Sequence, residues 1–114
     1  MSEGGVVLEA TGLPSAPLDA AAHFHAELVP TIRRFFGKAA DVVLVLRLAD
    51  HAHDAWRLAA IQELAREAAP CRVNAVVGSA GDPDGTGEAI AFLHDSPGIT
   101  GQILKVGGKS GAVA

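Results

Sequence analysis

Two histidines and an aspartate lie close together near the middle of the chain, at His51, His53 and Asp54. Imidazole and carboxylate groups are ligands that zinc takes readily, and metal-binding loops often follow a strong strand. This spacing is therefore compatible with a metal site. The plainer alternative, which we favour, is a solvated loop that leads into a helix capped by Asp54.

Four further features could take part in ligand binding, and each has a plainer structural explanation. Gly85–Gly87 could hold a phosphate on free backbone N–H groups, or it could be a helix-entry loop. Trp56 could stack on a ligand, but packing or an interface is the commoner role. Cys71 is the single cysteine, so no internal disulfide is possible, and we expect a small buried side chain. His23 and His25 point to different sides of a helix and form no ligand pair.

Composition limits the class of protein before any element is placed. A chain of 114 residues forms one small domain, and its formal net charge of −4 disfavours a nucleic-acid partner or an acidic membrane surface. Hydrophobic residues make up 49% but aromatic ones only 4%, which predicts a core of alanine, valine and leucine. There is neither a signal-peptide pattern nor an apolar run of membrane-spanning length. We therefore expect a cytoplasmic protein without a membrane partner.

The elements that would position these residues alternate between strand and helix. Four short strands and three helices in the order β-α-β-α-β-α-β predict an α/β fold with three layers, a parallel sheet and right-handed crossovers. Residues 109–114 are expected to be a flexible tail. The predicted strands are 6–10, 41–46, 73–77 and 102–106, the predicted helices are 17–36, 54–69 and one beginning near 88, and 78–87 is predicted as a loop.

Hydrophobic spacing predicts which faces of these elements are buried. Pro30 should kink or split the first helix, and the continuous apolar run 41–46 should be covered on both faces. One stripe of each helix should face the sheet. The stripes comprise Phe24, Leu28, Ile32 and Phe35 in the first helix, Leu58, Ile61, Ala65 and Ala68 in the second, and Ile90, Phe92 and Leu93 in the third.

Two motifs resemble the family of short-chain dehydrogenases/reductases. Phe92–Leu93, Ser96 and the run Ile99–Gly108 resemble the closing helix and strand of that family, and Arg72–Val76 resembles its penultimate strand. The similarity extends over residues 6–108 and corresponds to the C-terminal half of the family. It is closest to the degenerate, flavodoxin-like N-terminal domain of high-molecular-weight β-ketoacyl-ACP reductases. It implies a truncated domain at 1–108 with a partial Rossmann or flavodoxin-like sheet.

The same resemblance indicates which functional groups are missing. The family binds its nicotinamide cofactor at a Gly-rich turn, and no such turn follows the first strand here. Its proton donor is a tyrosine, and this sequence contains none. The family's tyrosine and lysine positions fall near Asp50 and Asp54, its serine falls within 47–49, and its nicotinamide-contacting proline is Gly78. The resemblance thus implies no catalytic residue and no bound cofactor.

Three hypotheses follow for function. The first is a non-catalytic protein that acts in oligomer assembly or as an accessory subunit, because the apolar strand 6–10 should have an open edge. The second is a subunit of an NAD(P)-dependent oxidoreductase of the ketoreductase type, completed by a partner chain. The third is a small flavodoxin-like module that binds a ligand or metal near Gly12, residues 47–53 and the loop 78–87.

For assembly we predict a homodimer or higher homo-oligomer, with a full-length short-chain dehydrogenase as a possible partner. A domain of this size should leave apolar helix faces uncovered, and a twofold axis lets each patch pair with itself. The two long helices should supply the main contact, and the final strand a second one. The predicted interface residues are His23, Phe24, Glu27, Trp56, Ala60, Glu63, Ile103 and Lys105.

Overall fold

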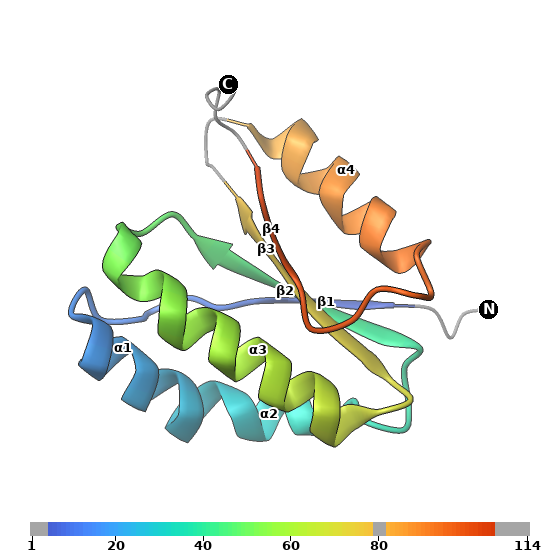
Figure 1. Cartoon of the computed structure of the whole chain (residues 1–114), viewed down its shortest axis with the longest axis horizontal. Helices are drawn as coiled ribbons and strands as arrows, with labels where there is room; N and C mark the ends of the chain where they lie inside the picture. Colours follow the sequence, from blue (N-terminus) through green and yellow to red (C-terminus); the bar gives the residue numbers. More distant parts are fainter. Residues whose placement is uncertain (1–4, 79–81, 107–114) are drawn as a thin grey trace.

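The predicted α/β fold is confirmed by the structure, a computed structural model that describes residues 5–78 and 82–106 (Figure 1). The predicted tail at 109–114 lies outside these residues. Helices and strands alternate as expected. The elements are β1 (Val6–Glu9), α1 (Pro17–His23), the π-helical η1 (Phe24–Leu28), α2 (Val29–Arg33), β2 (Asp41–Arg47), the short η2 (His51–His53), α3 (Asp54–Ala68), β3 (Arg72–Gly78), α4 (Pro83–His94) and β4 (Ile103–Lys105).

The four strands form one parallel sheet in the order β1-β2-β3-β4. Val42 of β2 lies between Val6 of β1 and Val73 of β3, so β2 and β3 form the centre of the sheet. The continuous apolar run in β2 is buried on both faces, as predicted, because helices lie on each side of it.

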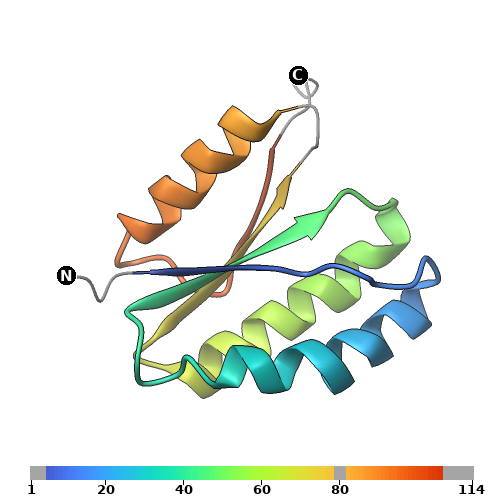
Figure 2. The same ribbon diagram turned by 180° about the vertical axis from the view of Figure 1, so that it is seen from behind.

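The two faces of the sheet are covered by different helices, which gives three layers (Figures 1 and 2). The layer α1–η1–α2 and α3 packs on one face, while α4 packs on the other. All three connections lead to the next strand in the same direction across the sheet, but α4 lies on the opposite face from the other helices. The crossover through α4 therefore has the opposite hand to the other two. The prediction of uniformly right-handed crossovers is therefore wrong.

Pro30 shapes the first long helix as the sequence predicts, but by a widened turn. Because proline has no N–H, the usual bond to residue 26 is missing, and the N–H of Val29 bonds to the carbonyl of Phe24, five residues back. The resulting π-helical turn directs Phe24 into the core, 5.5 Å from the ring of Trp56. The helix ends at Arg33, three residues earlier than predicted, and Gly37 with φ of 81° takes part in the turn that follows.

The last helix begins earlier than predicted, at Pro83 rather than near 88. Asp82 is its N-cap and accepts a bond of 2.9 Å from the N–H of Gly85, while Pro83 occupies the first turn, where no N–H is needed. The second half of the predicted loop 78–87 is thus helical. Residues 79–81 lie outside the described part of the chain.

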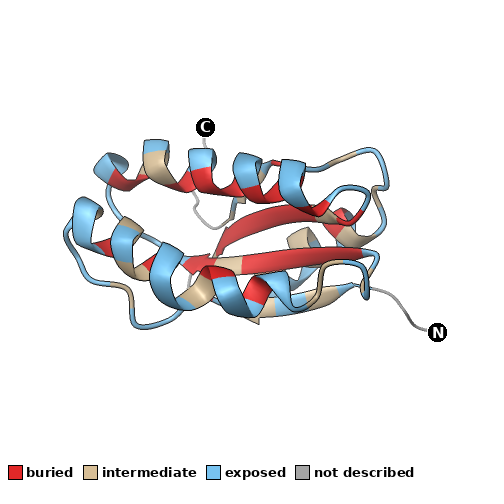
Figure 3. Cartoon of the chain, turned by 90° about the horizontal axis from the view of Figure 1, so that it is seen from below, coloured by how far each residue is buried: buried red, intermediate tan, exposed pale blue. Residues whose placement is uncertain are grey.

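The buried stripes of two helices also differ from the prediction. Leu58 and Phe92 are 41% and 53% exposed, whereas Arg57 occupies the inward position on α3. Figure 3 shows buried positions running along the sheet-facing side of the α1–α3 layer. The stripe on α3 starts one residue earlier than expected and comprises Arg57, Ala60, Ile61, Leu64, Ala65 and Ala68. No helix within the described residues is both long and apolar enough to cross a membrane.

Candidate functional site

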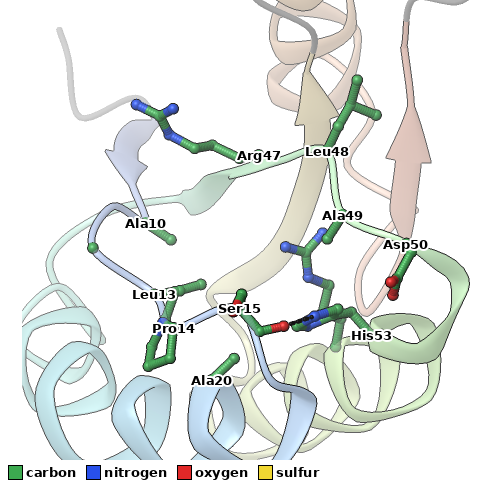
Figure 4. A pocket seen from close by; sticks show the side chains of 12 residues that line it. Ala10, Leu13, Pro14, Ser15, Ala20, Arg47, Leu48, Ala49, Asp50 and His53 are labelled. Carbon is green, nitrogen blue, oxygen red and sulfur yellow. Dashed lines mark hydrogen bonds between the residues drawn. The ribbon is translucent and has the colours of Figure 1, made fainter.

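The carboxyl ends of β1 and β2 open onto a cavity of about 440 Å³, which we name the carboxyl-edge cavity (Figure 4). Ligand sites in open α/β sheets form at this end of the strands. Its walls come from the loop after β1, the loop after β2 and the first turns of α3. The residues that line it include Gly12, Leu13, Ser15, Ala49, Asp50 and Arg57.

His53 joins two of these walls. Its Nε2 lies 2.9 Å from the carbonyl oxygen of Ser15, as Figure 4 shows, and the indole N–H of Trp56 donates to its Nδ1 over 3.1 Å. Because an indole nitrogen can only donate, Nδ1 must be the acceptor and Nε2 must hold the proton. Both ring nitrogens of His53 are therefore used to hold the loop after β1 against α3.

This arrangement separates the two histidines of the candidate metal site. His51 is exposed and lies 3.2 Å from the Asp54 carboxylate, whereas the buried His53 has no free nitrogen for a metal. Within residues 5–78 and 82–106, no group of three or more histidine, cysteine or acidic side chains is placed to hold a metal ion. The geometry favours a structural role for both histidines.

Asp54 does not cap α3 as the sequence suggested, because it is the first residue of that helix. The cap in this loop is Asp50, whose carboxylate accepts from the N–H of Ala52 at the start of η2. Asp54 instead accepts a bond of 3.3 Å from Lys105 at the edge of the sheet. That bond, followed by the one from His51, lowers the pKa of Asp54.

Arg57 is the unexpected residue of the carboxyl-edge cavity. It is only 6% exposed, and its Nε has no hydrogen-bond partner. Its guanidinium carbon lies 6.0 Å from the Trp56 ring centroid, and removal from water lowers the pKa of Arg57, although nearby Asp54 opposes the effect. The sequence analysis missed this residue. Its spacing from Ile61 and Leu64 would have placed it on the inward face.

The positions that the resemblance aligns with the family's catalytic residues run from the end of β2 to the first residue of α3. Asp50 and residues 47–49 line the carboxyl-edge cavity, and Asp54 follows at the start of α3. In Figure 4 the side chain of Arg47 extends away from Ser15 and His53. These positions therefore supply a loop and a cap but no tyrosine, lysine or serine.

Gly85–Gly87 lies inside α4, so it is not a phosphate-binding loop. The N–H of Gly85 is already bonded to the Asp82 carboxylate, and the hydroxyl of Thr86 donates to the Asp82 carbonyl over 3.1 Å. Thr86 also packs over the end of β3, where a Cβ added at Gly78 would lie 2.7 Å from its hydroxyl oxygen. The glycine at this position allows the close approach of α4.

A second polar cluster lies at the opposite, amino-terminal edge of the sheet. The carboxylate of Asp41 is 1% exposed and lies 2.9 Å from Nδ1 of His94 and 3.7 Å from Arg72. Arg72 also donates to the carbonyl oxygens of Leu93 and Ser96 at 2.9 and 2.8 Å. These bonds satisfy the end of α4 and attach it to the starts of β2 and β3, so the cluster is structural.

Among the described strands, β1 has a hydrogen-bonded neighbour on one side only, as predicted for residues 6–10. Its side chains Val6 and Leu8 face the α1–α3 layer, but Val7 and Glu9 face the other side. Val7 is 43% exposed there. A groove of about 680 Å³ separates this half of the sheet from α4, lined in part by Glu9, Val45, Thr86 and Ile90.

The predicted interface residues lie in different environments. Phe24 and Ala60 are in the core, at 1% and 4% exposed, so neither offers a surface to a partner. The role of the other six in assembly stays a prediction. His23, Trp56 and Ile103 are partly buried, and Glu27, Glu63 and Lys105 are exposed.

The buried thiol of Cys71 lies at the start of β3 in the larger core. Its removal from water, aided by the charge of Asp41, raises the pKa of Cys71. The prediction of a buried cysteine is confirmed.

Comparison with known families identifies one match. A family model described as "SDR-like: Short chain dehydrogenase-like protein" matches residues 8–106. No curated protein and no solved structure matches the chain.

Proposed function

This chain belongs to the short chain dehydrogenase-like protein family, and from that premise we propose that it acts through assembly rather than through catalysis. The single observation that supports the proposal is the half-covered edge of the sheet. There, among the strands that the structure describes, β1 pairs with β2 alone, and Val7 faces a side on which α4 packs against β2 and β3 instead. An exposed apolar edge strand is a surface that pairs readily with another chain.

The non-catalytic part of the proposal rests on a proton donor that the sequence lacks. Reductases that this chain resembles use a tyrosine as proton donor, and the sequence contains no tyrosine. At the equivalent loop, Asp50 caps η2 and Asp54 pairs with Lys105. Neither carboxylate replaces a phenol whose proton is available at neutral pH.

The occupant that fits the edge best is a second copy of the same chain. Two β1 strands related by a twofold axis would run antiparallel and exchange backbone hydrogen bonds, which extends both sheets into one. The same axis would bring the two Val7 side chains near each other on the half-covered face. As an accessory subunit, the chain would present the same edge to a longer member of the family.

Sedimentation of the purified protein at micromolar concentration tests this proposal. We expect a dimer, and we expect Val7→Lys to shift it to monomer because a charge on the pairing edge opposes strand addition. Val7 is already half-exposed, so the variant should stay folded. The same preparation should show no turnover of nicotinamide cofactors with carbonyl substrates.

A matched control is Leu18→Lys, which adds the same charge at an exposed leucine on α1, in the helical layer of the opposite face. It should leave the dimer intact. A wild-type monomer, or a Val7→Lys dimer as stable as the wild type, would contradict assembly through β1. Cofactor-dependent turnover by the isolated protein would contradict the non-catalytic role and favour the oxidoreductase hypothesis.

A further inference from the structure

Arg57 presents a buried positive charge that lies near Asp54 but forms an ion pair with no carboxylate of the described residues. Arg57 is only 6% exposed, and it lines the carboxyl-edge cavity. Within the described residues its guanidinium forms neither a hydrogen bond nor an ion pair, and its Nε is an orphaned donor. Buried charges in proteins are normally paired, because an unpaired one is strongly destabilising.

The acidic groups near Arg57 are engaged elsewhere. Asp54, one turn earlier on α3, accepts from Lys105 and lies beside His51. Asp50 lines the same cavity but caps η2 through the N–H of Ala52. His53 offers no charge, since the bond from Trp56 leaves its Nδ1 without a proton. An anion that entered the cavity would therefore find a guanidinium free to bind it.

The remaining walls of the cavity are mixed, with Arg47 and Ser15 as polar members beside a group of apolar side chains. Ala10 and Ala20 are buried, while Leu13 and Pro14 come from the loop after β1, as Figure 4 shows. The volume of about 440 Å³ is that of a small-molecule site. A bare inorganic anion would use the charge but leave the apolar walls in contact with water.

From the buried guanidinium and these apolar walls, we infer that the carboxyl-edge cavity binds a small carboxylic acid with a short aliphatic tail. The two terminal nitrogens of Arg57 donate to the carboxylate as a fork, and the tail lies against Leu13, Pro14 and Ala20. The site lies on the α1–α3 face of the sheet and the edge groove on the α4 face, although both reach Arg47 and Leu48 at the end of β2. The binding groups that we name do not include Val7 or the free edge of β1, so either proposal can fail without the other.

Trp56 is the only tryptophan in the chain, and it lies between His53 and Arg57, so its fluorescence reports on the site. Sodium butyrate is the probe, with inorganic phosphate and sodium chloride at matched ionic strength as comparisons. We expect a saturable change in emission with butyrate, at concentrations where phosphate and chloride give none. Butyrate should also raise the melting temperature. A saturable response to phosphate alone, or to none of the three, would overturn the inference.

Arg57→Met keeps the volume of the side chain but removes its charge. It should weaken butyrate binding roughly tenfold or more, and without ligand it should melt at the same or a higher temperature than the wild type, because an unpaired buried charge is gone. A merely structural arginine would give the opposite: a lower melting temperature and unchanged binding.

Two further variants keep the test decisive. Arg57→Lys retains the charge without the fork and should weaken butyrate binding several-fold. Should Arg57→Met fail to fold, unchanged binding by Arg57→Lys would overturn the inference. The control is Arg66→Met on the exposed side of α3, where the native side chain pairs with Glu63. It should bind butyrate like the wild type, and a loss of binding there would also count against the site.

Discussion

The two faces of the sheet are covered by layers that differ in size and in kind. Among the described residues, sixteen buried hydrophobic residues form a continuous core between the sheet and the α1–α3 layer, whereas three, Val43, Val76 and Leu93, form the buried hydrophobic contact between the sheet and α4. The first layer covers the sheet from Val6 and Leu8 of β1 to Ile103 of β4. The second leaves Val7 exposed.

Polar contacts supplement the small core on the α4 side. Arg72 donates to the carbonyls of Leu93 and Ser96, and His94 meets the buried Asp41. Asn74, on the same face, donates to the carbonyl of Ile99 and accepts from the N–H of Gln102. Such bonds are directional, so they fix the position of α4 and of the turn into β4 more than they add to stability.

The comparison suggests a division of roles. Stability should depend mainly on the α1–α3 face, where the apolar area removed from water is greatest. The α4 face should depend on a few specific polar bonds, and its uncovered part near β1 is the surface to which we assign assembly. Substitutions on the two faces should therefore differ in size and in where they act.

Phe24→Ala should give the largest effect. The ring is 1% exposed in the larger core and packs against Trp56, so its loss should lower the free energy of unfolding by about 4 kcal/mol. Urea denaturation followed by circular dichroism measures it. The control is Phe92→Ala on α4, where the ring is 53% exposed and the cost should be about 1 kcal/mol or less. Similar losses of unfolding free energy in the two variants would contradict the proposed difference between the faces.

Asp41→Asn should have the next largest effect and should act on the α4 side. It leaves Arg72 and any charge on His94 without the buried carboxylate, which should cost about 3 kcal/mol. Hydrogen exchange should accelerate in α4 and in residues 99–102 more than in α3. The control is Asp95→Asn, an exposed aspartate beside His94. If exchange accelerated equally in α3, the polar cluster would not be specific to α4.

Much of this fold was predictable from the sequence because hydrophobic spacing and glycine or proline positions act locally. The run 41–46 and the proline at position 30 led directly to β2 and to the disrupted helix. The handedness of the α4 crossover was not predictable in the same way. It depends on which face α4 covers, and that is set by contacts between Leu93, Val43 and Val76, far apart in the sequence.

The candidate site was predictable in place but not in chemistry. The third hypothesis placed a ligand site near Gly12, residues 47–53 and the loop 78–87, and the carboxyl-edge cavity lies at the first two of these. The roles of His53 and Arg57 were not predicted: His53 was weighed as a metal ligand against a solvated loop, and Arg57 was not singled out. The burial of each side chain decides its role. Arg57 is buried because the inward stripe of α3 starts there and not at Leu58, and the buried His53 bonds to Ser15 and Trp56.

The smallest effect should come from Cys71, which reports on how dry the larger core is. Cys71→Ala should lower the free energy of unfolding by only about 1 kcal/mol, because a small side chain is lost.

Since burial raises the pKa of the Cys71 thiol in the folded state, the unfolded chain loses this proton first as pH rises. The free energy of unfolding therefore falls above about pH 9. Urea denaturation at pH 8 and at higher pH should show this fall in the wild type, and a smaller one in Cys71→Ala. The folded thiol should react with a thiol reagent far more slowly than the unfolded chain does. A reaction as fast as that of an exposed thiolate would mean that water reaches the start of β3. The α1–α3 face would then not exclude water at this edge of the sheet, and the contrast with the half-covered α4 face would not hold there.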